Sequence, residues 1–178
     1  SLSLYDGIGN LITKNNEECL SKTQNFIKLG NIVAIRGIGG FLLALDAHNK
    51  QSIEILRKRK GRPSKPFAVM AKDISVIEKY CLVNDAEKAL LQSQSAPIVI
   101  LTLKSETKNC LPISVLSPDT NTLGVMLPYS PLHLLLFDKD LDLLVMTSGN
   151  KRGEPICIKN EESFFMLNGI ADYFLTHN

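Results

Sequence analysis

The stretch that decides the fold is NIVAIRGIGGFLLALDAHNKQSIEILRKRK, residues 31–60. A β-branched run at 31–36 and an apolar run at 41–45 flank a glycine-rich turn, which is typical of two adjacent strands. Asn49 then precedes a segment whose Ile53 and Leu56 form its buried side, which predicts a helix over 51–59. Strand, return strand and helix in immediate succession indicate an α/β protein.

The same alternation continues along the rest of the chain. Helices are expected over 15–29, 84–91, 131–137 and 161–167, and strands over 67–71, 97–103, 123–127, 143–147, 155–158 and 173–176. The run PIVILTL at 97–103 is nearly continuous and β-branched, so we expect it to be buried on both faces. Residues 1–14 are expected to be an irregular lead-in. We therefore predict a single α/β domain over residues 1–178, with one sheet covered by helices on both faces.

The composition is that of an ordinary globular protein. The chain has 178 residues, of which 44% are hydrophobic and 21% charged, and this excludes a disordered chain. The most apolar stretch, 123–146, is interrupted by prolines and charges, and no signal-peptide pattern opens the chain, so we expect no membrane segment and a cytoplasmic protein. Four cysteines and three histidines are scattered, and their spacing supports neither a zinc site nor a disulfide.

The net charge of +2 conceals a local cluster. Six basic residues and no acidic one lie within 57–65, and the remainder of the chain carries a formal charge of −4. Cations at 57–59 suit the last turn of a helix. Lys60, Arg62 and Lys65 are expected to lie beyond the helix in a proline-stiffened loop, where they could grip a polyphosphate. A basic cluster also attracts a nucleic-acid backbone, although no aromatic residue is interleaved here for base stacking.

Two loops at strand ends are candidate ligand sites. Gly-Ile-Gly-Gly at 37–40 fits neither the dinucleotide fingerprint nor the P-loop, so a tight turn with positive φ is the simpler interpretation. Thr147, Ser148 and Asn150 follow a buried strand, at the position where α/β sheets bind ligands. A hydroxyl and an amide there can donate to phosphate oxygens, but the same residues would also form a turn without a ligand.

Taken in order, three further segments complete a pattern with the stretch quoted first. They are LRKRKGRPSKPFAVMAKD (56–73), NTLGVMLPYSPLHLLLF (121–137) and LVMTSGNKRGEPIC (144–157). Together these segments resemble the YrdC-like domain, and more narrowly that domain as it occurs in the HypF-like carbamoyltransferases of hydrogenase maturation. The resemblance spans residues 30–178 and implies a YrdC-like fold with a twisted mixed sheet.

The resemblance also implies a set of site residues. The family's Lys-x-Arg pair falls on Lys60 and Arg62, the implied catalytic residues, and its Ser-x-Asn element falls on Ser148 and Asn150. The other positions implied to bind the nucleotide or the carbamoyl group are Arg36, Gly39, Gly40, Lys65 and Thr147. No protein side chain is implied as a metal ligand.

The implied reaction joins ATP and carbamate to give carbamoyl-adenylate and pyrophosphate. This is one step in making the cyanide ligands of [NiFe]-hydrogenase. Magnesium would accompany ATP, and no zinc is expected in this part of the protein. HypF-like proteins also carry acylphosphatase, zinc-module and carbamoyl-transfer domains, so the chain is expected to be part of a longer protein. The downstream carbamoyl acceptor would be HypE.

Two other functions stay open from the sequence. One is a threonylcarbamoyl-adenylate synthase for tRNA modification. That branch usually has a Pro-Thr-Asp-Thr strand end and an Arg-x-Pro segment, where this chain has 36–40 and Met126-Leu127-Pro128. Both departures favour the HypF branch. The other is a non-enzymatic module that binds double-stranded RNA through its basic loop.

Overall fold

The computed structural model describes all residues, 1–178, and divides into two compact units. Unit 1 comprises residues 1–45, 51–63 and 146–178, and unit 2 comprises residues 46–50 and 64–145. Each unit combines β-strands with helices, which confirms the predicted α/β class. None of the helices has both the length and the apolar character that crossing a membrane requires.

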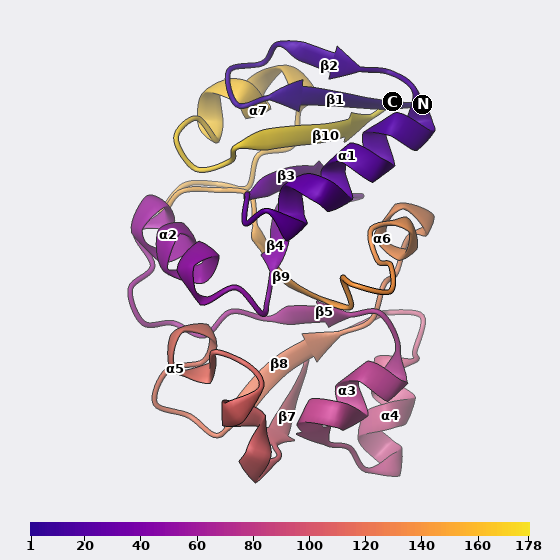
Figure 1. Cartoon of the computed structure of the whole chain (residues 1–178), viewed down its shortest axis with the longest axis vertical. Helices are drawn as coiled ribbons and strands as arrows, with labels where there is room; N and C mark the ends of the chain where they lie inside the picture. The colour runs from indigo at the N-terminus through magenta and orange to yellow at the C-terminus, as the bar shows by residue number, and fades with distance from the viewer. The chain divides into compact units, whose positions relative to one another are not determined.

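The strands of unit 1 form a mixed sheet in the order β2-β1-β10-β3-β4. Their bounds are β1 (Leu2–Asp6), β2 (Leu11–Thr13), β3 (Val33–Arg36), β4 (Phe41–Asp46) and β10 (Tyr173–His177), as Figure 1 shows. β10 pairs antiparallel with β1 and parallel with β3, while β3 and β4 form the predicted antiparallel neighbours.

The expectation of an irregular lead-in at residues 1–14 is wrong. β1 pairs along its whole length with β10, from Leu2 opposite His177 to Asp6 opposite Tyr173. The two partners stand at opposite ends of the chain, so the pairing depends on a tertiary contact that a local pattern does not reveal.

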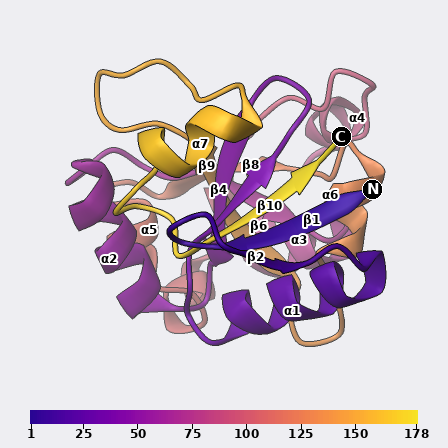
Figure 2. The same cartoon turned by 90° about the horizontal axis from the view of Figure 1, so that it is seen from above.

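Three helices belong to unit 1: α1 (Asn16–Lys28), α2 (Lys50–Lys60, apart from its first residue) and α7 (Asn160–Met166). Phe26 of α1 stacks on Tyr173 with ring centroids 3.7 Å apart, and Phe164 of α7 meets Phe174 edge-on at 5.0 Å. Consecutive strand residues point to opposite faces. Helices α1 and α7 therefore cover opposite faces of β10, as Figure 2 shows and as predicted.

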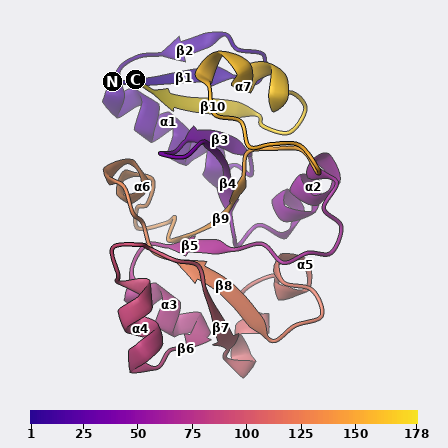
Figure 3. The ribbon, with the colours of Figure 1, turned by 180° about the vertical axis from the view of Figure 1, so that it is seen from behind.

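Unit 2 has strands in the order β9-β5-β8-β7-β6, with α3 against β5 and β6 and α4 against β7 (Figure 3). The strand bounds are β5 (Val69–Ala71), β6 (Cys81–Leu82), β7 (Val99–Leu103), β8 (Thr122–Met126) and β9 (Leu143–Ser148), which runs on into unit 1. The helix bounds are α3 (Ile74–Tyr80), α4 (Asp85–Leu91), the 3₁₀ turn η1 (Ser105–Asn109), α5 (Ile113–Leu116) and α6 (Pro131–Leu135).

β7 corrects a second expectation, because only one of its faces is buried. Val99 and Leu101 are buried, whereas Ile98, just before the strand, and Ile100 are 54% and 64% exposed. Helix α4, which confirms the helix predicted at 84–91, packs on β7 and begins with a complete capping box at Asn84. An apolar run thus predicted the strand correctly but not how many of its faces are covered.

Candidate functional site

The site begins at the end of α2, where Lys60 is the last helical residue. The prediction that Lys60 lies in the following loop is wrong, because Pro63 restricts the residue before it and leaves position 60 free to remain helical. Gly61, with φ of +66°, ends the helix. The helical conformation turns Lys60 inward, and its side chain is only 4% exposed.

The Lys60 ammonium donates to oxygens of Ser148, the last residue of β9, and of Asn150 in the loop that follows. Its Nζ lies 2.6 Å from the carbonyl oxygen of Ser148 and 2.9 Å from that of Asn150. The side-chain oxygens of the same residues lie 2.8 Å (Asn150 Oδ1) and 3.3 Å (Ser148 Oγ) away. Burial, and then the charge of Arg62, lowers the pKa of Lys60 to about 8, so the amine remains largely protonated at neutral pH.

The side chains of Ser148 and Asn150 are also bonded to each other. The Ser148 hydroxyl donates to Asn150 Oδ1 at 2.7 Å, and Asn150 Nδ2 donates to the carbonyl oxygen of Glu154 at 2.8 Å. Thr147, which is 9% exposed, precedes this pair at the end of β9. That Ser148 and Asn150 donate to a phosphate remains a prediction, and in this conformation their donors serve the loop itself.

Backbone hydrogen bonds hold this loop against β4. Gly149 donates to the carbonyl of Phe41 at 2.8 Å, Cys157 donates to that of Gly149 at 2.9 Å, and Phe41 donates to that of Cys157 at 2.8 Å. The strand predicted at 155–158 is absent, because Cys157 bridges two segments instead of joining a ladder. We call these three hydrogen bonds between residues 41, 149 and 157 the backbone frame of the loop. The sequence did not predict this frame, because backbone N–H and carbonyl groups of any residue type can form such bonds.

Glycine is required at two positions of this frame. A Cβ on Gly149 would lie 2.6 Å from the carbonyl oxygen of Phe41. Gly40 has φ of +145°, and a Cβ there would lie 2.8 Å from Cγ2 of Ile156. The interpretation of 37–40 as a tight turn is confirmed, and Gly37 donates to the Gly40 carbonyl at 2.8 Å. Gly39, by contrast, faces open space.

Two arginines accompany this arrangement in unit 1. Arg36 ends β3 beside the glycine turn, with its guanidinium carbon 5.7 Å from the centroid of the Phe41 ring. Its Nη1 is buried and has no hydrogen-bond partner, which leaves a donor for an anion. Arg62 lies near Lys60, and burial lowers its pKa from the usual value. Lys65 is exposed and belongs to unit 2.

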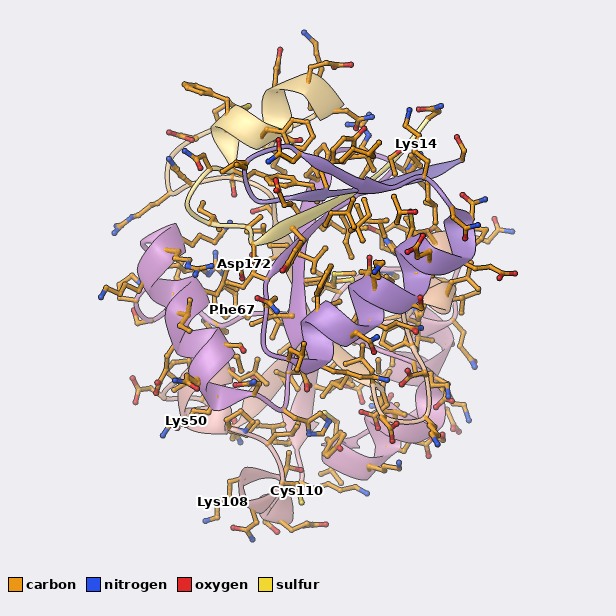
Figure 4. All side chains as sticks on the ribbon, turned by 45° about the horizontal axis from the view of Figure 1, so that its top comes forward. Lys14, Lys50, Phe67, Lys108, Cys110 and Asp172 are labelled. Carbon is orange, nitrogen blue, oxygen red and sulfur yellow. The ribbon has the colours of Figure 1, made fainter.

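The remaining basic residues of the cluster point elsewhere. Arg57 donates to the carbonyl of Arg62 at 2.9 Å, and Arg59 forms an ion pair with Asp172, the residue before β10 that Figure 4 labels. Lys58 lines an open hollow of about 540 Å³ on the surface of unit 1. No group of three or more His, Cys, Asp or Glu residues is placed to hold a metal ion. The helix thus separates charges that are contiguous in sequence.

The chain belongs to the Sua5/YciO/YrdC family, whose model, described as "Telomere recombination", matches residues 25–178. It is 42% identical over 99% of its length to the carbamoyltransferase HypF of Synechocystis, and it covers 23% of that protein. The crystal structure of T. kodakarensis HypF matches all of the chain with a TM-score of 0.93 and 41% identity, over 23% of that structure.

A structure of full-length HypF in a phosphate- and nucleotide-bound form matches 99% of the chain and 22% of its own, with a TM-score of 0.85 and 44% identity. These findings confirm the resemblance to the YrdC-like domain of HypF. The chain spans less than a quarter of the length of the curated relatives that it matches.

Proposed function

We propose that this chain forms carbamoyl-adenylate and pyrophosphate from ATP and carbamate. The observation that carries the proposal is that Lys60 and Arg62 lie together beside the loop 148–150 in unit 1, while Arg36 lies over the ring of Phe41, whose backbone bonds to that loop. The chain that holds this arrangement is 42% identical to a carbamoyltransferase and 44% identical to a nucleotide-bound structure. The similarity to these proteins suggests ATP and carbamate as substrates. Both substrates are anions, which the positive charges of the site would attract.

The chemistry needs charge stabilisation more than proton transfer. Carbamate is already an anion, and its oxygen forms a bond to the α-phosphorus of ATP while the bond to the pyrophosphate oxygen breaks. The pyrophosphate leaves with the electron pair, and no proton has to move. Cations and hydrogen-bond donors that lessen the repulsion between two anions are therefore sufficient. The site supplies guanidinium groups and no histidine or carboxylate, in agreement with this requirement.

Magnesium enters this proposal as part of the substrate, bound to the phosphate oxygens of ATP. The residues that surround Lys60 offer hydroxyl, amide and carbonyl oxygens, but no carboxylate group contacts it. These oxygens are already occupied by an ammonium, so we assign no protein side chain as a magnesium ligand.

Transfer of the carbamoyl group onward belongs to the longer proteins that this chain resembles. We propose that the product passes to other domains of such a protein, which comprise acylphosphatase, zinc-module and carbamoyl-transfer domains. HypE would then receive the carbamoyl group for the cyanide ligands of [NiFe]-hydrogenase. With ATP as substrate, the reaction would take place in the cytoplasm.

Pyrophosphate release from magnesium-ATP in a mixture of ammonium and bicarbonate, which supplies carbamate, tests the proposal. We expect carbamate to stimulate release and Arg62→Ala to lower the rate by about 100-fold, because one charged stabiliser of the transition state is lost. Lys58→Ala removes an exposed cation from the same helix and should leave the rate unchanged. A separate arm replaces ammonium with threonine.

Stimulation by threonine and bicarbonate, but not by carbamate, would assign the chain to threonylcarbamoyl-adenylate synthesis. A full rate in Arg62→Ala would remove that residue from the site. If no condition releases pyrophosphate and the chain instead binds double-stranded RNA with a steep salt dependence, the adenylation proposal fails.

A further inference from the structure

Lys60 faces other groups of the protein rather than the solvent, and its contacts suggest a role distinct from phosphate binding. We propose that Lys60 is a positioning residue: its ammonium holds Ser148 and Asn150 in place from within the protein and does not itself bind the phosphates. The inference deepens the proposed function, on which it rests for the identity of the ligand, but the contacts that carry it exist without any ligand.

The donors of Lys60 are fully used inside unit 1. An ammonium group has three N–H donors. Three oxygens, two from Asn150 and one from Ser148, lie within 2.9 Å of Nζ, and Ser148 Oγ follows at 3.3 Å. With 4% of its surface exposed, the side chain has no donor directed to solvent. A phosphate could reach this nitrogen only after displacing the loop oxygens.

The loop is shaped around the ammonium. The carbonyl of Ser148 points to Nζ at 2.6 Å, and the N–H of the same peptide group belongs to Gly149 and donates in another direction, to Phe41 at 2.8 Å. A trans peptide places its C=O and N–H on opposite sides, so this group is held from both. Two residues later the Asn150 carbonyl returns to Nζ at 2.9 Å.

The side chains of Ser148 and Asn150 extend the hydrogen-bond network from Lys60 to the rest of the loop. Asn150 Oδ1 accepts from both Lys60 and the Ser148 hydroxyl, so its amide orientation is set by two donors. The Nδ2 group then donates to the Glu154 carbonyl at 2.8 Å and fixes the following turn. Removal of the ammonium would leave the Asn150 carbonyl without its donor. The Ser148 carbonyl would keep only the Asn150 N–H at 3.0 Å, and Asn150 Oδ1 only the Ser148 hydroxyl at 2.7 Å, so the loop 148–154 would loosen.

This arrangement divides the work between the two residues of the Lys-x-Arg pair. Lys60 points inward from the last turn of α2 and orders the loop. Arg62 lies two residues further on, past the glycine that ends the helix, and its charge acts on Lys60. In this assignment Arg62 contributes the cation that meets the phosphates.

Amide hydrogen exchange of the whole chain without ligand measures the positioning role. We expect Lys60→Met to speed amide exchange at residues 148–154 by about tenfold or more. The loop would lose the ammonium that holds the oxygens of Ser148 and Asn150 and would open more often. Trypsin should also cleave sooner after Lys151 and Arg152. Lys58→Met, the same change at an exposed position of α2, should match the unchanged protein in both measurements.

ATP binding, measured on the same variants, separates positioning from direct contact. Arg62→Met should weaken ATP binding without changing exchange at 148–154, whereas Lys60→Met should change both. Lys60→Arg keeps a cation and should restore part of the loop protection and part of the affinity together. Normal loop protection in Lys60→Met with affinity lowered tenfold or more would show that Lys60 contacts the ligand, and would overturn the proposal.

A pH series on the unchanged protein decides the matter if Lys60→Met does not fold. After correction for base catalysis, exchange at 148–154 should rise between pH 7 and 9, as the amine loses its proton. Arg62 is the charged group that acts on Lys60, and the charged residues of the loop, Lys151, Arg152 and Glu154, are exposed. Unaltered exchange across this range would overturn the proposal. If the unchanged protein binds no ATP, the proposed function fails, while loop exchange still tests positioning.

Discussion

Two neighbouring cations of α2 stand in contrasting surroundings. Arg59 meets the carboxylate of Asp172 at 2.9 Å, and both side chains keep about a third of their surface exposed. Lys60, the next residue, is buried and surrounded by uncharged oxygens of Ser148 and Asn150. A rotation of about 100° per helical residue directs them to different parts of unit 1.

The comparison indicates that burial and hydrogen bonding, more than pairing with an opposite charge, decide how much a cation contributes to the structure. An exposed ion pair contributes little, since water solvates both partners when they separate. A buried ammonium shared by several oxygens removes one hydrogen bond from each of them when it is lost, and the Asn150 carbonyl then has no other donor. We therefore expect changes around Lys60 to exceed changes at Arg59, and three further experiments can break or sharpen that expectation.

The largest effect is expected for Gly149→Ala, which would disrupt the backbone hydrogen bonds that hold the loop 148–154 against β4. The new Cβ would stand 2.6 Å from the carbonyl oxygen of Phe41, so backbone must shift. The free energy of unfolding should fall by about 2–3 kcal/mol, measured by urea denaturation. Gly39→Ala is the matched control, because its Cβ would meet nothing within 4 Å. Equal stability of the two variants would contradict the requirement for glycine at position 149.

A smaller effect is expected from the protonation of Lys60. Burial lowers its pKa in the folded protein from the usual 10.5 to about 8, so the unfolded chain binds more protons between these limits. For this group alone, the unfolding free energy must therefore rise with pH, by about 1 kcal/mol from pH 7 to 9. The measurement compares urea denaturation of the unchanged protein and Lys60→Met at both pH values. A stability difference that moves the other way would mean that the loop oxygens raise the pKa of Lys60.

The smallest effect is expected for Arg59→Met. The ion pair with Asp172 is partly exposed, and Arg59 also donates to the Ile170 carbonyl at 3.1 Å. We expect the unfolding free energy to fall by less than about 1 kcal/mol, and the loss to shrink in high salt. Thermal unfolding at low and high ionic strength measures both. A salt-independent loss of several kcal/mol would remove the contrast with Lys60.

The sequence predicted much of the local structure and the residue types of the candidate site. The helices predicted at 15–29 and 84–91 are present, and their caps at Asn15 and Asn84 rest on contacts within a few residues. The position of Ser148 and Asn150 at the end of an apolar strand was equally readable, although the strand includes Ser148. In contrast, β1 was missed because its partner β10 lies at the other end of the chain, and the covered faces of β7 could not be read from an apolar run.

By itself, the sequence determined most of the longer helices and strands and the identity of the basic cluster, because these depend on spacing over a few residues. It did not reveal β1, β2, α3 or β6, and it predicted a strand at 155–158 that is absent. Only the tertiary structure decided which cations of the cluster, Arg57 and Lys60, are buried. Lys60 contacts the oxygens of Ser148 and Asn150 for two reasons. Helix α2 continues one residue beyond the predicted end at residue 59, and the segment from residue 148 onward packs against the Lys60 side chain. Contacts between residues 88 and 90 positions apart depend on the packing of the whole unit, which no local pattern contains.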